Sequence, residues 1–222
     1  MADAQRPEIE LTDRLRSCYS GAVYDAMRDL GLAPAVLPSA IRPLDSGFAL
    51  AGPIWPCEGR PDQSADDHET LLGWTRLLSA APAGAVVVCQ PNDSSIAHMG
   101  ELSAEALRTR GVLGFFVDGG CRDTEFIVNR RFPVFCRYRT PSDVVGRWVV
   151  ESLGEPIRIG EVDINAGDFL LADIDGAVVI PAGAVEAVTE SAEKLISTES
   201  EMRRAILAGM DPSEAYLKYG VF

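Results

Sequence analysis

The sequence lacks several features that would place the protein in a particular class at once. It contains no run of eighteen or more apolar residues and no apolar segment behind a basic start, so neither a membrane partner nor a secretion signal is predicted. It also lacks a linker rich in glycine, serine or proline, which favours one domain over residues 1–222. These absences predict a soluble globular protein of the cytoplasm.

Positive charge is scarce as well. Lysine and arginine total 20 against 33 aspartates and glutamates, giving a formal net charge of -13. A surface with this excess repels a phosphate backbone, so no nucleic-acid partner is expected, although a local cationic pocket is compatible with the total. The five cysteines form an odd set without C-x-x-C spacing. They predict reduced, mostly buried thiols instead of a zinc knuckle or a redox pair.

Short apolar runs and helical patterns alternate in the middle of the chain. Residues 83–90 and 111–118 are apolar and β-branched, as in buried strands, and residues 100–111 between them carry a helical pattern. This order predicts a strand, helix, strand crossover with parallel strands. The residues of that helix expected to face inward are Leu102, Ala106 and Leu107.

The flanking segments predict a mixed α/β layout. One or two helices fit residues 7–30, with a break near 20–21. The prolines between positions 34 and 61 predict only short, irregular strands. Antiparallel strands are expected from 147 to 181, followed by a long amphipathic helix at 182–208.

Two loops follow the predicted strands at the same end. They are A-H-M-G-E-L-S at 97–103 and D-G-G-C-R-D at 118–123. Because the carboxyl ends of parallel strands open on one edge of a sheet, both loops are expected to line one crevice. Gly100 presents the free N–H groups of a helix start, Arg122 offers a fork of donors for a carboxylate, and Asp123 offers an oxygen ligand for Mg²⁺ or Mn²⁺. Together they predict a pocket for a small 2-keto acid.

Each candidate also has an ordinary structural interpretation. Asp123 is well placed to cap the short helix that follows it, and Asp118 to hydrogen-bond the glycine turn. His98 could touch substrate or pack inside the domain, whereas Cys121 has no base partner and is interpreted as a packing residue. The sequence D-D-H-E at 66–69 predicts a solvated helix start, because consecutive helical positions do not converge on one ion.

Several segments together resemble a known family. The motif G-E-L-S-A-E-A-L-R-T-R-G-V-L-G-F-F-V-D-G-G-C-R-D closely resembles the signature of the RraA-like family, which includes the 4-hydroxy-4-methyl-2-oxoglutarate aldolases. The likeness extends to S-G-A-V-Y-D-A-M-R-D-L-G, F-P-V-F-C-R, A-G-D-F-L-L-A-D-I-D-G-A-V-V-I-P and A-Y-L-K-Y-G-V-F, so it covers most of the chain. It implies an α/β fold, an α/β/β/α sandwich of the swivelling-domain type with mixed sheets and a C-terminal helical tail at about 182–222.

The resemblance also implies roles for individual residues. It gives Arg122 the role of binding the pyruvyl group and Asp123 that of binding a divalent metal. Backbone contacts and an acidic residue near the metal come from the loop Gly100, Glu101, Leu102 and Ser103. A trimer or a dimer of trimers is implied, in which an acidic residue from the C-terminal helix of a neighbouring subunit completes the site. Glu199 matches that residue best, and Glu201 is the alternative.

The implied function is a metal-assisted lyase. It would cleave 4-hydroxy-4-methyl-2-oxoglutarate or a related 2-keto acid to pyruvate, and would also decarboxylate oxaloacetate. The motif has no lysine nearby that could form a Schiff base with the substrate, and this favours the metal route. The alternative is a non-catalytic member of the family that binds and inhibits a ribonuclease. The acidic match on the C-terminal helix favours the enzyme over the regulator.

Overall fold

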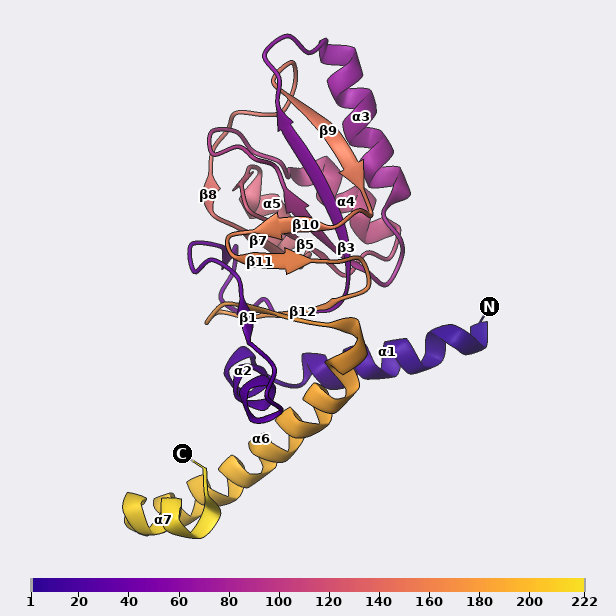
Figure 1. Ribbon diagram of the computed structural model, residues 1–222. Coiled ribbons are helices and arrows are strands. Elements are labelled where there is room, and N and C mark those ends of the chain that lie inside the picture. Colours follow the sequence, from indigo (N-terminus) through magenta and orange to yellow (C-terminus); the bar gives the residue numbers. More distant parts are fainter. Residues whose placement is uncertain (1, 222) are drawn as a thin grey trace.

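The computed structural model describes residues 2–221, and their side chains from residue 9 onward. Helices pack against a β-rich body, and the C-terminal helices lead away from it (Figure 1). The predicted N-terminal helices are confirmed, with their break at 17–19, just before the expected position. The helical elements are α1 (Ala2–Arg16), α2 (Ser20–Asp29), α3 (Asp67–Ala80), α4 (Glu101–Thr109), α5 (Thr124–Asn129), η1 (Ala182–Ala184), α6 (Val185–Leu207) and α7 (Pro212–Tyr219).

The main sheet is mixed and has the strand order β1-β13-β12-β3-β4-β5-β7-β2, with β9 pairing with β3. Its strands are β1 (Ala35–Val36), β2 (Arg42–Pro43), β3 (Leu50–Pro61), β4 (Val86–Gln90), β5 (Gly114–Val117), β7 (Val134–Cys136), β9 (Trp148–Leu153), β12 (Phe169–Ala172) and β13 (Ala177–Ile180). Two separate pairs are β6 (Gly120–Cys121) with β8 (Tyr138–Arg139), and β10 (Ile157–Ile159) with β11 (Val162–Ile164). The predicted crossover is confirmed, because β4 and β5 pair in parallel on either side of α4 in the sequence.

Alternating side chains of the central strands enter two different cores. On β4, Val87 and Cys89 join the core beneath α3, α4 and α5, whereas Val86 and Val88 join the core shared with β10 to β13. A third core packs α1, α2 and α6 against the other face of β12 and β13. The order of layers is therefore helices, sheet, sheet, helices, which confirms the predicted α/β/β/α architecture.

The long strand β3 corrects the expectation for the proline-rich segment. It runs for 12 residues through the centre of the sheet, where only short strands were predicted. Pro53 lies at the end of the antiparallel ladder with β12, and Pro56 immediately precedes the ladder with β9. The prolines thus stand where the strand changes partners, which the sequence pattern did not reveal.

Other expectations are confirmed. Strands β9 to β13 pair in antiparallel fashion, and all five cysteines are buried free thiols. Asp66 caps α3 by accepting hydrogen bonds from the N–H groups of His68 and Glu69, so the D-D-H-E stretch is a helix start. Among the described residues, no helix combines the length and apolarity required to cross a bilayer.

Candidate active site

Main-chain hydrogen bonds join the two predicted loops at the edge of the parallel strands. Ala97 forms a parallel bridge with Gly120, and the N–H of His98 donates to the carbonyl of Gly120 at 2.9 Å. One residue pair further on, the N–H of Arg122 donates to the carbonyl of Met99 at 2.9 Å. The loops therefore continue the parallel pairing beyond β4 and β5, and they bring the start of α4 beside the Arg122–Asp123 pair, as predicted.

Gly100 is packed directly against this pair. A Cβ atom at this position would lie 2.8 Å from Oδ2 of Asp123 and 3.2 Å from Nε of Arg122. The backbone of Gly100 is extended, at φ -144°, which any residue adopts. Glycine is therefore required here for close approach and not for its conformational freedom.

Asp123 does not cap the helix that follows it, so that interpretation of the sequence is wrong. It occupies the N-cap position of α5 with a left-handed backbone, φ 53° and ψ 34°, and its side chain makes no capping hydrogen bond there. Its Oδ2 atom instead accepts the N–H of Glu101, the first residue of α4, at 3.1 Å. The left-handed conformation costs a non-glycine residue about 1 kcal/mol. In this conformation the carboxylate of Asp123 is directed at α4.

Arg122 lies between two carboxylates. Its Nη1 atom donates to Oδ2 of Asp143 at 3.1 Å, and its Nε atom lies 3.5 Å from Oδ2 of Asp123. Asp143 is itself fixed, because its Oδ1 atom accepts the N–H of Val145 at 3.2 Å. The side chains of Arg122 and Asp123 are 38% and 40% exposed, so these ion pairs add little to stability and chiefly orient the guanidinium.

A shallow hollow of about 340 Å³ opens beside the pair. Its walls come from two segments, 121–124 and 139–141, which the parallel pairing of β6 and β8 brings together. Cys121 is the register partner of Arg139, and the N–H of Thr140 donates to the carbonyl of Cys121 at 3.1 Å. Sequence reasoning missed Arg139 and Asp143, because no motif distinguished R-Y-R-T-P-S-D from an ordinary loop.

The predicted contacts on α4 point in different directions. Leu102 was expected to face inward, but it is 83% exposed, and Ala104 and Leu107 are the buried apolar residues. The Ser103 hydroxyl accepts a hydrogen bond from Nε1 of Trp74 at 2.8 Å, so it faces the helical core. The side chain of Glu101 is partly buried and forms no hydrogen bond within the described part of the chain. The first turn of α4 thus offers its backbone and Glu101 to the site.

Glu199 and Glu201 lie on α6, which leads away from the body that contains α4 (Figure 1). Glu199 accepts a hydrogen bond from the hydroxyl of Tyr19. Burial and this contact raise the pKa of Tyr19 to about 12. Glu201 is exposed. Within residues 9–221, no hydrogen bond or ion pair connects either glutamate to the Arg122–Asp123 pair, so their assignment depends on a neighbouring copy.

Two further residues of the loops have structural roles. Asp118 pairs with Arg137 and accepts from Nε2 of Gln90 at 3.1 Å, instead of holding the glycine turn as expected. His98 is 1% exposed and packs edge-on against Trp148. Neither of its ring nitrogens has a hydrogen-bond partner among the described residues, and Nε2 lies 3.8 Å from Oδ1 of Asp93. Burial lowers the pKa of His98 to about 4. It is a packing residue below the loop, not a lining residue of the hollow.

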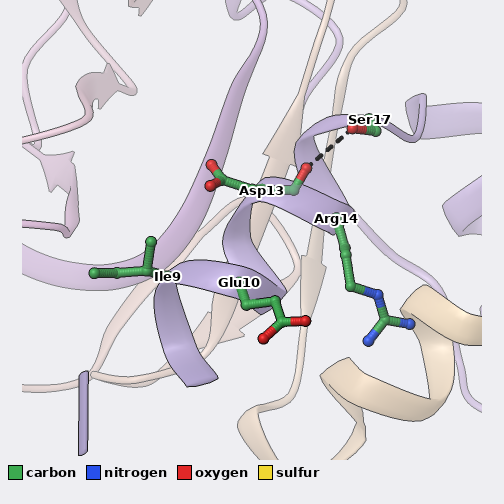
Figure 2. A pocket seen from close by; sticks show the side chains of 5 residues that line it. All are labelled: Ile9, Glu10, Asp13, Arg14 and Ser17. Carbon is green, nitrogen blue, oxygen red and sulfur yellow. Dashed lines mark hydrogen bonds between the residues drawn. The ribbon is translucent and has the colours of Figure 1, made fainter. Parts of the chain in front are cut away.

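Another surface hollow, about 610 Å³, lies elsewhere, along α1 (Figure 2). Its lining residues all come from this one helix: Ile9, Glu10, Asp13, Arg14 and Ser17. Arg14 points toward α6, where it forms two hydrogen bonds with Glu193, and the hydroxyl of Ser17 donates to the carbonyl of Asp13. Arg14 and Ser17 are thus engaged by other groups of the protein, and the lining side chains do not converge on a ligand, so this hollow is not the better candidate.

Comparison with known proteins decides the family. The RraA-like family model, described as Aldolase/RraA, matches residues 20–179. The chain belongs to the RraA-like family. This RraA-like chain is 30% identical over 213 residues, 95% of each chain, to a Halalkalibacterium halodurans protein named "Putative 4-hydroxy-4-methyl-2-oxoglutarate aldolase".

Solved structures share the fold of this RraA-like chain. One, described as novel cellulases from microbes associated with the gut ecosystem, has a TM-score of 0.81 and 31% identity, with 87% of each chain covered. Another is Streptomyces coelicolor RraAS2, described as an unusual member of the RNase ES inhibitor RraA protein family. It has a TM-score of 0.76 and 24% identity, over 87% of this chain and 96% of that one, and at this identity it shows the fold alone.

Proposed function

We propose that this RraA-like protein is a divalent-metal-dependent carbon–carbon lyase. It cleaves 4-hydroxy-4-methyl-2-oxoglutarate or a related 2-keto acid to pyruvate, and it decarboxylates oxaloacetate. The observation that carries this proposal is the contact of Arg122 and Asp123 with Gly100, at the amino end of α4 and beside a hollow of about 340 Å³. A guanidinium, a carboxylate and free backbone amides at one place suit an anionic keto acid.

The residues present fit a divalent cation held by one carboxylate and water. Oδ2 of Asp123 is engaged by α4, whereas Oδ1 has no hydrogen bond among the described residues. Glu101 stands next to it in the structure, because its own N–H makes that contact. No group of three or more histidine, cysteine, aspartate or glutamate side chains converges within the described part of the chain. One or two carboxylates are the protein contribution that Mg²⁺ typically receives.

A bound Mg²⁺ or Mn²⁺ would polarise the 2-keto group of the substrate. Arg122 binds the adjacent carboxylate and stabilises the negative charge that develops as the carbon–carbon bond breaks. The first intrahelical bond of α4 runs from the N–H of Ala104 to the carbonyl of Gly100, which leaves the N–H groups of Leu102 and Ser103 available for an anionic oxygen. Glu101 accepts the proton of the substrate hydroxyl, with Glu199 or Glu201 of a neighbouring copy as its counterpart.

We further propose that the protein acts as a trimer or a dimer of trimers. Exposed apolar side chains support an assembly, because they lie both near the hollow and on the C-terminal helices. Near the hollow these are Leu102 and Phe126, which are 83% and 56% exposed. On the C-terminal helices they are Leu207 and Leu217, which are 80% and 82% exposed.

The test is release of pyruvate from oxaloacetate in Mg²⁺ or Mn²⁺, with and without chelator, after subtraction of the metal-only background. We expect chelator-sensitive turnover that Asp123→Asn abolishes. Asp163→Asn, an exposed carboxylate on β11 outside the hollow, is the matched control and should retain it. Full turnover by Asp123→Asn would refute the assignment of the metal residue. Absence of turnover in the folded wild-type protein, together with ribonuclease binding, would establish the regulator instead.

A further inference from the structure

A second arginine lines the hollow that Arg122 borders. Arg139 lies on β8, beside Thr140 and across from Cys121, and Thr124 completes this wall. The sequence as a whole is acidic, with a formal net charge of -13. The hollow thus holds two guanidinium groups, together with the carboxylate of Asp123.

The two arginines differ in how their charge is balanced. Arg122 has the carboxylates of Asp143 and Asp123 at 3.1 and 3.5 Å. Arg139 is exposed, and no carboxylate within the described residues lies within ion-pair distance of it. A positive charge without a counter-charge, at the wall of a hollow, is suited to an anionic group of a ligand.

Arg139 is also held in place. Its Nη2 atom donates to the carbonyl of Leu44 at 3.0 Å, and the N–H of Leu44 donates to the carbonyl of Val134 at 2.9 Å. Leu44 is buried, so the guanidinium is anchored to the rigid body of the domain. One of its five N–H donors is used in this contact, and the others remain for a ligand.

We propose that Arg139 binds the second carboxylate of the substrate and selects 4-hydroxy-2-oxo acids that carry a carboxylate on C4. This inference rests on the proposed lyase function. A hollow of about 340 Å³ suits a compact diacid of this size. Arg122 would hold the carboxylate next to the keto group, and Arg139 the one at the far end.

The chemistry gives this role a signature. In the aldol substrate, the C4 hydroxyl loses its proton, the C3–C4 bond breaks, and its electron pair forms the enolate of pyruvate. C4 becomes a keto carbon and keeps its carboxylate throughout. In oxaloacetate, the second carboxylate is itself lost as CO₂, so its charge disappears in the transition state. Binding by Arg139 therefore assists the aldol cleavage but cannot lower the barrier for decarboxylation.

The experiment compares wild type with Arg139→Gln on three substrates. They are 4-hydroxy-4-methyl-2-oxoglutarate, 4-hydroxy-2-oxopentanoate, which lacks the second carboxylate, and oxaloacetate. We expect kcat/KM for the first to fall about 10- to 100-fold through KM, as loss of a charged hydrogen bond predicts. The values of kcat/KM for the other two should change less than about 3-fold. Equal losses on all three substrates, or none, would overturn the proposal.

Two controls separate this inference from the proposed function. Arg76→Gln removes an exposed arginine on α3, across the body from β8 in Figure 1, and should leave the preference for the second carboxylate unchanged. If the wild type cleaves none of the three substrates, the lyase function is refuted. A binding measurement then still tests the role of Arg139. By calorimetry, Arg139→Gln should then lower the binding affinity for 2-oxoglutarate about 10-fold and leave the affinity for 2-oxobutyrate unchanged. Equal affinities of wild type and variant for 2-oxoglutarate would refute the role of Arg139.

Discussion

The edge of the parallel strands and the C-terminal helices hold their predicted site residues in different ways. At the sheet edge, main-chain hydrogen bonds fix Arg122 next to Met99, and Gly100 packs against the pair. On α6, Glu199 has a side-chain contact with Tyr19, on a helix that leads away from the body (Figure 1). The edge is built within one chain, whereas the helical tail acquires a role in catalysis only if a second copy meets it.

This difference decides which residues a single sequence can locate. A crossover between parallel strands places the two following loops together whatever their side chains are. No comparable rule connects a distant helix to a site on another copy. Predictions for the edge therefore concern geometry, and predictions for the tail concern association.

Among substitutions that leave the side chains of Arg122 and Asp123 unchanged, the largest effect should come from Gly100→Ala. The added methyl group would lie 2.8 Å from Oδ2 of Asp123 and 3.2 Å from Nε of Arg122, so it must displace the pair. We expect pyruvate release to fall at least about 100-fold, because a shift of about 1 Å at reacting groups has effects of this size. Pyruvate release and thermal unfolding would be measured together.

Gly73→Ala is the matched control for this substitution. Gly73 lies within α3, and a Cβ atom there meets nothing within 4 Å. We expect unchanged activity and stability higher by about 0.5–1 kcal/mol, because alanine is the better helix former. Normal turnover by Gly100→Ala would show that the site does not depend on this close approach.

Low pH should destabilise the loops at the edge of the parallel strands. His98 is buried below the loop and its pKa is lowered to about 4, from an ordinary value near 6.5. The folded protein therefore excludes a proton that the unfolded chain binds below pH 6.5. The contribution of neutral His98 to the free energy of unfolding is fully present above pH 6.5. It declines as the pH falls toward 4, by at most about 3 kcal/mol.

Urea unfolding at pH 7, 5.5 and 4.5 would measure this decline. His98→Leu removes the titrating ring, so its free energy of unfolding should fall less steeply over this range than that of the wild type. His68→Leu, on the exposed first turn of α3, serves as the control. Identical pH slopes for wild type and His98→Leu would show that burial of the imidazole does not govern acid sensitivity.

A smaller effect is expected at Asp143. Its carboxylate orients Arg122 at 3.1 Å and is held by the N–H of Val145. Asp143→Ala should lower kcat/KM about 10-fold, because Arg122 loses its fixed position. Asp143→Asn keeps an acceptor oxygen and should restore most of the loss. If the asparagine variant is as impaired as the alanine variant, the charge of Asp143 matters and its geometry does not.

The sequence predicted which loops meet at the candidate site, but not the contacts between their side chains. The strands at 86–90 and 114–117 were predictable, because a β-branched apolar run buried on both faces has few alternatives. The ion pair of Arg122 with Asp143 was not predictable, because it joins two loop residues 21 positions apart. The helical pattern assigned Leu102 to the interior together with Ala106 and Leu107, although 83% of Leu102 is exposed. Long strand β3 was missed because its prolines occur where it changes partners.

The smallest effect on stability and activity should come from a substitution that alters a contact of the C-terminal helix α6. Tyr19→Phe removes the hydroxyl that donates to Glu199, and both residues are partly exposed, so unfolding should change by less than about 0.5 kcal/mol. If Glu199 of one copy serves the site of another, its lost orientation should lower kcat a few-fold. Glu190→Gln, an exposed residue on the same helix, is the control.

Mixing two inactive variants tests whether the sheet edge of one copy and the C-terminal helix of another form the site together. Asp123→Asn and Glu199→Gln subunits combined in one assembly should regain part of the activity, because intact edges then meet intact tails. Subunits that complete their sites within one chain cannot regain activity in this way. Failure of the mixture, with the assembly verified by light scattering, would show that Glu199 acts within its own chain or not at all. The tail would then serve association alone, and the acid–base residue would have to lie on the sheet edge, where Glu101 stands.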